Sequence, residues 1–348
     1  MYRIAIFQND LGVGGIQKSV VNLVKNLDYG KVEAELFLCE DGGIFSGSLP
    51  PKLKVHIIGH IPGRYKYLPF DVAYSRAKLT LPETEPFDVA IDFNTYQPEC
   101  AIGAISVPAE KRVMWIHNNV LIKYKNEWKY RVLFNAFKGK YKYFEEFVPC
   151  SGALEEPFRT LTGINDKPFT VINNFIDVSE IRAKSAEPCD INPDPDCLNF
   201  AAMGRLCHQK GYDIMLDAFS QACAERGDLR LYILGDGEDL PKLKALSGDL
   251  GITDKVFFLG NKPNPYCYLN KMDAFISTSR YEGQPLNIKE AQVIGLPLYC
   301  TKNLEAYSDG LAGYSDITAA LITAKKEPKR PDDLMEYNKK IIDSIMKL

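Results

Sequence analysis

Two glutamates stand in an otherwise apolar stretch of the chain, SRYEGQPLNIKEAQVIGLPL, at residues 279–298. Pro285 suits the start of a helix, where its missing N–H needs no partner, and Gly295 suits the end of that helix. Glu282 then lies just before the helix and Glu290 in its second turn. The preceding sequence DAFIST predicts a strand, so both carboxylates should lie at the carboxyl edge of a sheet, where open α/β folds bind ligands.

The chemistry open to these carboxylates is limited by the helix start beside them. Free N–H groups and the positive end of a helix dipole favour an anion such as phosphate. Carboxylates would be repelled by that anion, so sugar hydroxyls are their natural partners, because a carboxylate accepts several O–H bonds. The alternative is structural: Glu282 caps the helix and Glu290 faces water.

A second polar cluster follows another expected strand, in the sequence FAAMGRLCHQKGYDIML. Gly204, Arg205, Lys210 and Gly211 form a glycine-bearing loop that leads into a helix. Two cations in such a loop could neutralise a diphosphate without a metal ion. Taken separately, an Arg and a Lys in a loop are more often solvated surface residues.

Composition limits the class of protein. The chain has 348 residues, 46% of them hydrophobic and 25% charged, with a formal net charge of −3, which predicts a globular protein of two domains. No global positive field favours nucleic acid, and no CxxC pair indicates structural zinc. Nine scattered cysteines are typical of a reducing cytosol. No stretch reaches the roughly 18 apolar residues of a membrane span.

Short apolar runs alternate with helix-like segments along the chain, which predicts parallel α/β architecture. In the first half the expected strands are residues 2–7, 34–39, 54–58, 88–93, 112–116 and 147–150. In the second half they are residues 198–204, 229–235, 255–260, 273–278 and 296–300.

A stretch rich in proline and acid at 186–197 has no apolar period and is expected to be a linker. The predicted domains are therefore 1–180, an N-terminal Rossmann-like acceptor domain, and 190–330, a C-terminal Rossmann-like domain for a nucleotide-sugar donor. The last segment, 331–348, has one apolar helical face and should pack back on the first domain.

The two motifs GRLCHQKG and EGQPLNIKE resemble those of the retaining GT-B glycosyltransferases of family 4, the glycosyl transferases group 1. The resemblance is specific mainly from Met203 to Thr301. It implies a GT-B fold, in which two Rossmann-like domains face a cleft. Asn287 and Lys289 depart from the pattern, because relatives often carry aliphatic residues there.

The resemblance also implies roles for individual residues. Arg205 and Lys210 would hold the diphosphate of a nucleotide sugar and serve catalysis, with Gly204 in the same loop. Glu290 would bind the ribose hydroxyls. The donor sugar and its phosphate would meet the catalytic Glu282 and the backbone amides of Gly283, Gln284 and Leu286.

The first half carries weaker signals. FQNDLGVGGIQKSVVNLV is a strand, a glycine-rich loop and a helix. As a dinucleotide fingerprint it is incomplete, with Gln17 in place of the third glycine, yet a dehydrogenase is not excluded. In family 4 the loop, through Gly14 and Gly15, packs against the donor phosphates and the acceptor. His117 ends an expected strand and matches a family position near the reacting sugar, although a lone histidine is more often structural.

The resemblance implies a retaining, metal-independent hexosyltransferase in surface polysaccharide biosynthesis. It would move a sugar from a nucleotide sugar, by default a UDP-sugar, to a glycan or lipid-linked glycan, with no cofactor. The alternatives are a sugar-nucleotide epimerase of GT-B fold, an NAD-dependent oxidoreductase and a non-catalytic nucleotide-sugar binder.

Residues 111–143 carry nine Lys or Arg and one acid, interleaved with aromatic residues. Such a stretch could rest on an anionic membrane surface, and the alternative is a pair of solvated helices. The sequence therefore predicts a cytoplasmic protein with peripheral contact at the inner face of the membrane, and no nucleic-acid partner.

Overall fold

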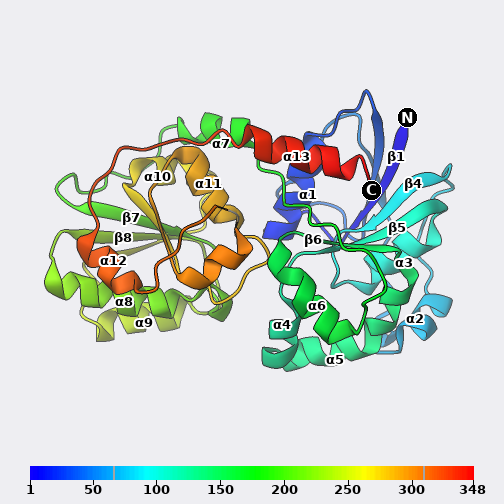
Figure 1. Cartoon of the computed structure of the whole chain (residues 1–348), viewed down its shortest axis with the longest axis horizontal. Coiled ribbons are helices and arrows are strands. Elements are labelled where there is room, and N and C mark those ends of the chain that lie inside the picture. The colour runs from blue at the N-terminus through cyan, green and yellow to red at the C-terminus, as the bar shows by residue number, and fades with distance from the viewer. Residues whose placement is uncertain (66, 309) are drawn as a thin grey trace. The chain divides into compact units, whose positions relative to one another are not determined.

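The structure is a computed structural model and describes residues 1–65, 67–308 and 310–348. The chain divides into two compact units. Unit 1 comprises Met1–Phe175 and Glu336–Leu348, and unit 2 comprises Ile176–Met335. Each unit has a parallel sheet with helices on both faces (Figure 1), which confirms the expected class of two parallel-sheet α/β domains.

Unit 1 contains a sheet of order β3-β2-β1-β4-β5-β6, and every pairing in it is parallel. Its strands are β1 (Tyr2–Gln8), β2 (Val32–Leu38), β3 (Lys54–Ile57), β4 (Phe87–Asp92), β5 (Ala109–Ile116) and β6 (Glu146–Pro149). The strand order reverses between β1 and β4. The carboxyl ends of these two strands are therefore where a ligand crevice is expected in this unit.

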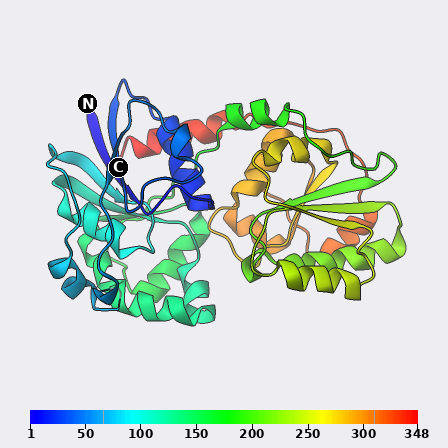
Figure 2. The same ribbon diagram turned by 180° about the vertical axis from the view of Figure 1, so that it is seen from behind.

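The helices of unit 1 cover both faces of its sheet. They are α1 (Gly15–Lys25), α2 (Phe70–Arg76), α3 (Pro98–Ser106), α4 (Val120–Asn126), α5 (Trp128–Phe137), α6 (Glu155–Thr162) and α13 (Met335–Ile345), with a 3-10 helix η3 (Lys138–Tyr143). The last helix, α13, lies beside α1 (Figures 1 and 2), and its Ile341 and Ile345 join the core that α1 lines with Val20 and Val24. The apolar face of the C-terminal segment is thus buried in unit 1.

Unit 2 contains a sheet of order β11-β10-β7-β8-β9, also parallel throughout. Its strands are β7 (Leu198–Met203), β8 (Leu229–Leu234), β9 (Val256–Gly260), β10 (Ala274–Ser277) and β11 (Leu298–Cys300). The order reverses between β7 and β10. The loops that leave the carboxyl ends of these two strands carry the residues singled out by the sequence, so the topology places both motifs at one crevice.

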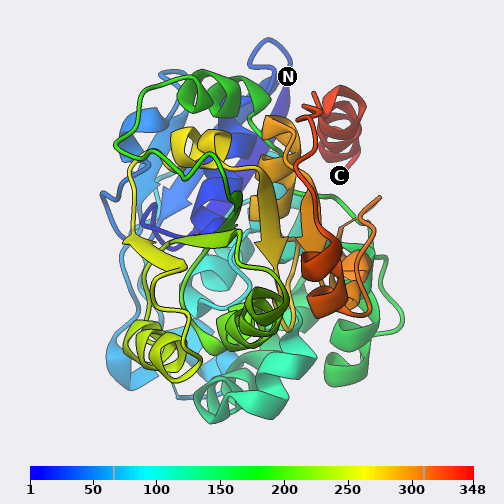
Figure 3. The same ribbon diagram turned by 90° about the vertical axis from the view of Figure 1, so that its left-hand side faces the viewer.

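Helices cover both faces of the unit 2 sheet (Figure 3). On one face lie α8 (Tyr212–Glu225), α9 (Leu240–Asp249) and α12 (Ile317–Thr323), and on the other α7 (Val178–Ser185), α10 (Pro265–Lys271) and α11 (Leu286–Ile294). Pro285 is the N-cap of α11, so the helix begins one residue later than the sequence predicted. In the described ranges of the chain, none of the helices has the length and apolarity that crossing a bilayer requires.

The segment 186–197, a linker according to its composition, lies within unit 2. Its carboxylates attach it there: Asp190 accepts a hydrogen bond from the hydroxyl of Tyr268, and Asp194 lies 3.8 Å from Arg230. A stretch rich in proline and acid therefore docks through side-chain contacts even though it lacks an apolar period.

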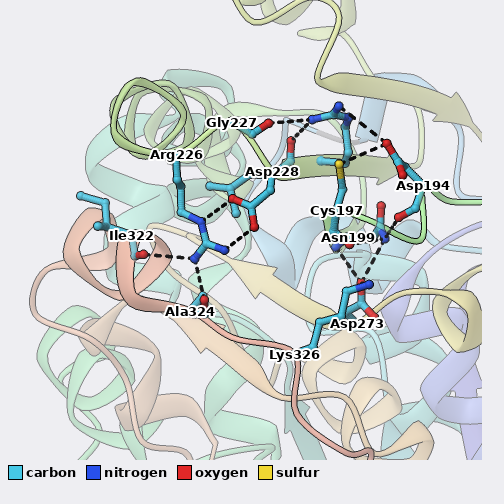
Figure 4. Close-up of polar contacts among 12 residues, drawn as sticks. Asp194, Cys197, Asn199, Arg226, Gly227, Asp228, Asp273, Ile322, Ala324 and Lys326 are labelled. Carbon is cyan, nitrogen blue, oxygen red and sulfur yellow. Dashed lines mark hydrogen bonds and ion pairs between the residues drawn. The ribbon is translucent and has the colours of Figure 1, made fainter.

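A polar network fastens the amino ends of the unit 2 strands (Figure 4). Arg226, at the end of α8, pairs with Asp228 at 2.6 and 2.7 Å and donates to the carbonyls of Ile322 and Ala324, where α12 ends. Asp273, before β10, accepts from the backbone N–H of Asn199 at 2.8 Å. This edge lies opposite the expected ligand edge, so its charges serve the fold.

Candidate functional site

The loops that follow β7 and β10 touch backbone to backbone. A Cβ on Gly211 would lie 2.3 Å from the carbonyl oxygen of Thr278, and Gly211 has φ +64°. The hydroxyl of Thr278 donates to the carbonyl of Gly211 at 2.8 Å. Only glycine combines that left-handed conformation with so close an approach. This contact brings the two sequence motifs together.

Arg280 reinforces the same junction and was not singled out by the sequence. Its backbone N–H donates to the carbonyl of Gln209 at 2.8 Å, and its guanidinium donates to the carbonyl of His208 at 2.8 Å. The guanidinium also forms a bidentate pair with Asp213, at 2.8 and 2.5 Å. These hydrogen bonds from Arg280 lower the pKa of the Asp213 carboxyl. Arg280 thus joins the β10 loop to the first turn of α8.

Lys210 and Glu282 form a direct ion pair across the junction, with Nζ 2.6 Å from Oε1. Their side chains are 20% and 7% exposed, so the pair is shielded but within reach of solvent. Gln209 supports the arrangement by donating to the carbonyl of Tyr281 at 3.0 Å. A predicted phosphate-binding cation and a predicted sugar-binding carboxylate are therefore neighbours, and a bound donor would have to share or separate them.

Arg205 projects from the same loop without a protein partner. It is exposed, and among residues 1–65, 67–308 and 310–348 its side chain makes no hydrogen bond or ion pair. The backbone before it is tightly placed: the hydroxyl of Tyr212 donates to the carbonyl of Gly204, and a Cβ on Gly235 would lie 2.0 Å from that oxygen. The loop is thus held while its guanidinium stays available.

Glu290 lies on α11 and is 4% exposed. The hydroxyl of Tyr266 donates to its Oε1 at 3.1 Å. Burial, followed by the charge of Glu290, raises the pKa of Tyr266. The helix begins without a side-chain cap after Pro285. The predicted amide donors lie at this helix start, namely Gly283, Gln284 and Leu286.

Asn287 and Lys289, the two residues that depart from the family pattern, are both held within unit 2. The amide of Asn287 donates to the carbonyl of Met203 at 2.7 Å, at the end of β7. Lys289 is 4% exposed and therefore does not point to water. Asn287 acts as a tie between α11 and the strand that precedes the Gly-Arg loop.

The glycine-rich loop of unit 1 is organised by a carboxylate. Asp10 accepts hydrogen bonds from the backbone of Gly12 at 2.7 Å and from the amide of Gln17 at 3.2 Å. A Cβ on Gly14 would lie 2.2 Å from Oε1 of Gln17, so Gly14 leaves room for that side chain. The helix α1 then begins at Gly15. An acidic group in this loop suits hydroxyl ligands better than a pyrophosphate.

His117 follows β5 and is 8% exposed. Burial lowers its pKa to about 3, opposed by a hydrogen bond to the backbone of Phe93. In the part of the chain that the structure describes, its Nε2 has no hydrogen-bond partner, so Nδ1 makes that contact. The ring is therefore neutral at physiological pH and presents Nε2 as an acceptor.

The structure thus places the candidates in two groups. The unit 2 group surrounds the ends of β7 and β10, and consists of Gly204, Arg205, Lys210, Glu282, Gly283, Gln284, Leu286 and Glu290. The unit 1 group, at the carboxyl edge of the other sheet, consists of Gly14, Gly15 and His117. Over the described residues, no cluster of three His, Cys, Asp or Glu side chains is arranged to hold a metal ion.

Several contributors were missed by sequence reasoning, namely Asp10, Gln209, Tyr266, Thr278 and Arg280. Arg280 had one usable signal, since it directly follows the same strand end as Glu282. Tyr266 had no such signal, because it and Glu290 are 24 residues apart in sequence and lie on different helices.

Comparison with known proteins agrees with this arrangement. The family described as Glycosyl transferases group 1 matches residues 190–341, which include every candidate of the unit 2 group. The chain therefore contains a glycosyl transferases group 1 domain. The match starts within the docked segment of unit 2 and runs into α13.

Individual relatives extend the likeness beyond this domain. An N-acetylgalactosamine-N,N'-diacetylbacillosaminyl-diphospho-undecaprenol 4-alpha-N-acetylgalactosaminyltransferase of Campylobacter jejuni is 26% identical over 86% of this chain and 81% of its own length. An uncharacterized glycosyltransferase of Methanocaldococcus jannaschii is 28% identical over 55% of this chain. The chain spans about half of that relative, 48% of its length.

Solved structures share the fold. The Anabaena protein HepE, crystallised in complex with UDP and glucose, superposes with a TM-score of 0.68 and 17% identity, covering 100% of both chains. At that identity the likeness concerns the fold alone, and it assigns the two parallel-sheet units of this chain to the GT-B fold.

Replacing Gly211 by alanine should disrupt the junction of the two loops. Gly251→Ala is the matched control, since Gly251 has φ +68° with open space around its Cβ position. The control should lose about 1 kcal/mol through backbone strain. Gly211→Ala should lose about 1 to 3 kcal/mol more, because its Cβ meets the Thr278 carbonyl. Urea unfolding measures both, and equal losses would show that the loops tolerate separation.

His117 should contribute a pH dependence to stability. Its pKa is lowered from 6.5 to about 3 in the folded protein. At a pH between these two values, His117 is therefore protonated in the unfolded chain and neutral in the native state. Unfolding free energy should therefore fall as pH drops below 6.5. Urea unfolding of wild type and His117→Gln measures this effect. Between about pH 7 and about pH 5, the unfolding free energy of wild type should fall more than that of His117→Gln. Parallel curves for the two proteins would contradict the assignment.

Proposed function

We propose that the chain is a retaining glycosyltransferase of family 4 that transfers a hexose-type sugar from a nucleotide sugar to a glycan or lipid-linked glycan. The observation that carries the proposal is the ion pair of Lys210 with Glu282 at the strand-order reversal of unit 2, with the exposed Arg205 in the same loop as Lys210, in a glycosyl transferases group 1 domain. UDP is the default nucleotide. The Campylobacter relative, named for transfer to a diphospho-undecaprenol glycan, supports an acceptor of that class and a place in surface polysaccharide biosynthesis.

The donor would be held by charge and hydroxyl contacts of unit 2. The guanidinium of Arg205 is exposed and makes no hydrogen bond to a described residue. The ammonium of Lys210 pairs only with Glu282 among the described side chains. Both are suited to a diphosphate. The buried carboxylate of Glu290, already oriented by Tyr266, has acceptor capacity for a ribose diol. Glu282 would then accept from hydroxyls of the donor sugar while keeping Lys210 oriented.

Chemistry would follow a front-face course. The bond between the anomeric carbon and the phosphate oxygen breaks, and the electron pair leaves with the phosphate. The acceptor oxygen bonds to the anomeric carbon on the same face and gives its proton to the leaving phosphate oxygen. Arg205 and Lys210 stabilise the developing charge there, so no metal ion is needed for that purpose. Positioning of the two substrates supplies the remaining rate enhancement.

Unit 1 would recognise hydroxyl groups. The neutral His117 can accept a hydrogen bond at Nε2, and the loop at Gly14 and Gly15 carries an acidic organiser, Asp10. The same loop weighs against an NAD-dependent oxidoreductase, because Gln17 stands at the position of the third glycine and its amide donates to Asp10. No observation favours an epimerase or a silent binder over transfer.

The deciding experiment is a thermal-shift panel of UDP-, GDP-, ADP- and CDP-sugars followed by donor hydrolysis without acceptor. Transfer to lipid-linked glycan, with the anomeric configuration of the product read by NMR, tests retention. A parallel reaction in EDTA tests independence of metal. Binding of a donor without hydrolysis or transfer would indicate a silent binder, and inversion at the anomeric carbon would reject the front-face course.

Arg205→Ala and Lys210→Ala should separate chemistry from folding. Each should lower turnover by about 100- to 1,000-fold, because each removes a donor to the leaving phosphate. Arg205→Ala should leave the melting temperature near that of wild type, since the side chain is exposed. Lys210→Ala should also cost about 1 to 3 kcal/mol of stability, because Glu282 loses its cation.

The control for this pair is Lys242→Ala on α9, whose side chain is 83% exposed. It should change neither turnover nor melting temperature. Matched losses of rate and stability in Arg205→Ala would assign that residue to the fold rather than to the reaction.

We also propose that part of residues 111–143 contacts anionic lipid. The structure narrows this surface, because Lys140 is 2% exposed and Lys142 pairs with Asp71 at 2.8 Å. What remains exposed on α5 and just before it combines charge with apolar area: Trp128 is 68% exposed and Val132 47% exposed. The basic residues beside them are Lys125, Lys129 and Arg131.

Vesicles of phosphatidylcholine with and without phosphatidylglycerol test the contact by sedimentation at low salt. The double variant Lys125→Ala/Lys129→Ala should bind anionic vesicles about 30-fold more weakly, from roughly 1 kcal/mol per basic residue. Lys242→Ala/Lys244→Ala, two exposed residues of α9, is the matched control and should bind as wild type does. Failure of wild type to sediment with anionic vesicles would remove the proposal.

A further inference from the structure

A buried ion pair lies at the carboxyl edge of the unit 1 sheet and has no part in the reaction described above. Asp92 ends β4 and is fully buried, and Lys140 of η3 is 2% exposed. The Lys140 Nζ lies 3.6 Å from Oδ2 of Asp92. Burial raises the pKa of Asp92 and lowers that of Lys140, while each charge partly offsets the effect on the other. A pair so costly to desolvate needs a local reason.

The pair holds the short loop after β4 in an unusual conformation. Thr95 has φ +65°, a left-handed value that is rare and strained for a β-branched residue. Three contacts impose it. The Thr95 N–H donates to Asp92 Oδ1 at 3.1 Å, its carbonyl accepts from Lys140, and its hydroxyl donates to the carbonyl of Trp115.

This loop is joined to the strand end that carries His117. Trp115 lies two residues before His117, and the His117 ring hydrogen-bonds the backbone of Phe93, two residues before Thr95. The N–H of Phe93 is already used by the carbonyl of Phe7, so the carbonyl of Phe93 is the group that accepts from His117 Nδ1. The rings of Phe93 and His117 are also in contact, with centroids 4.6 Å apart.

We infer that Asp92 and Lys140 are positioning residues that, through the strained Thr95 loop, lock His117 in the tautomer that donates from Nδ1 and presents Nε2 to a substrate hydroxyl. The hydrogen-bond partner of one ring nitrogen decides which nitrogen carries the proton. The role assigned to Nε2 rests on the proposed glycosyltransferase function. The locking itself concerns only the folded protein.

The test reads the tautomer directly and needs no substrate. Protein with 15N-labelled histidine gives long-range 1H–15N correlations for its four histidines, and His117→Gln identifies the signal of His117. Wild type should show a single Nδ1–H form. Lys140→Met should show a mixture or the Nε2–H form, because the Thr95 carbonyl loses its donor and the loop can relax to negative φ.

Two further variants separate positioning from general stability. Lys167→Met is the matched control: Lys167 donates to the carbonyls of Tyr141 and Lys142 in η3 and of Phe144 just after it, and none of these three bonds involves the Thr95 loop. It should keep the Nδ1–H form. The double variant Asp92→Asn/Lys140→Met removes both buried charges, so its melting temperature should be higher than that of Lys140→Met. The wild-type tautomer of His117 should not return in it.

Turnover supplies the second readout, with hydrolysis of UDP-glucose as the probe. Lys140→Met should lower kcat about 10- to 100-fold with an unchanged donor KM, because the proposed donor contacts lie in unit 2. An unchanged tautomer in Lys140→Met, or its full recovery in the double variant, would overturn the inference. Wild type that shows the Nδ1–H form but does not turn over any nucleotide sugar would instead reject the proposed function.

Discussion

The contact between Gly211 and the carbonyl of Thr278 is the constraint on which the candidate donor site depends. The β7 and β10 loops can meet only where one chain has no side chain and a left-handed backbone. Once they meet, Arg280 can bind both loops, and the ammonium of Lys210 reaches Glu282. A two-ångström separation would remove the ion pair and the orientation of both groups.

The two units use the carboxyl edges of their sheets in different electrostatic ways. In unit 2 the edge carries the ion pair of Lys210 with Glu282 and, beside it in the sequence, the exposed guanidinium of Arg205, so an anionic ligand can bind a cation that pairs with no other described side chain. In unit 1 burial keeps His117 neutral, and the buried ammonium of Lys140 contacts Asp92 and the carbonyl of Thr95. Positive charge is thus exposed at the edge of unit 2, where phosphate is proposed to bind. At the edge of unit 1, where hydroxyl groups are proposed to bind, the charged side chains of Asp92 and Lys140 are buried.

Polar groups at the opposite edges have another purpose. At the amino ends of the unit 2 strands, Arg226 satisfies Asp228 and two carbonyls, so its donors are used within the protein. At the carboxyl edge of unit 1, by contrast, several buried atoms of described residues lack partners, including Nε2 of Gln8, Nε1 of Trp115 and Nε2 of His117. Buried polar atoms are rarely left unpaired without a functional reason. These unpaired atoms leave binding capacity at the edge of unit 1 where hydroxyl groups are proposed to bind.

The sequence by itself determined the parallel α/β class, the position of every expected strand to within a few residues, and the placement of both charged motifs after β7 and β10, because apolar runs and glycine turns are local signals. It misjudged 186–197, whose docking depends on Tyr268 and Arg230 far along the chain. Only the tertiary structure decided that Lys210 pairs with Glu282, that Tyr266 orients Glu290, and that Lys140 is buried rather than on a basic surface. Those outcomes depend on which distant side chains a fold brings within a few ångströms, and no local pattern encodes that distance.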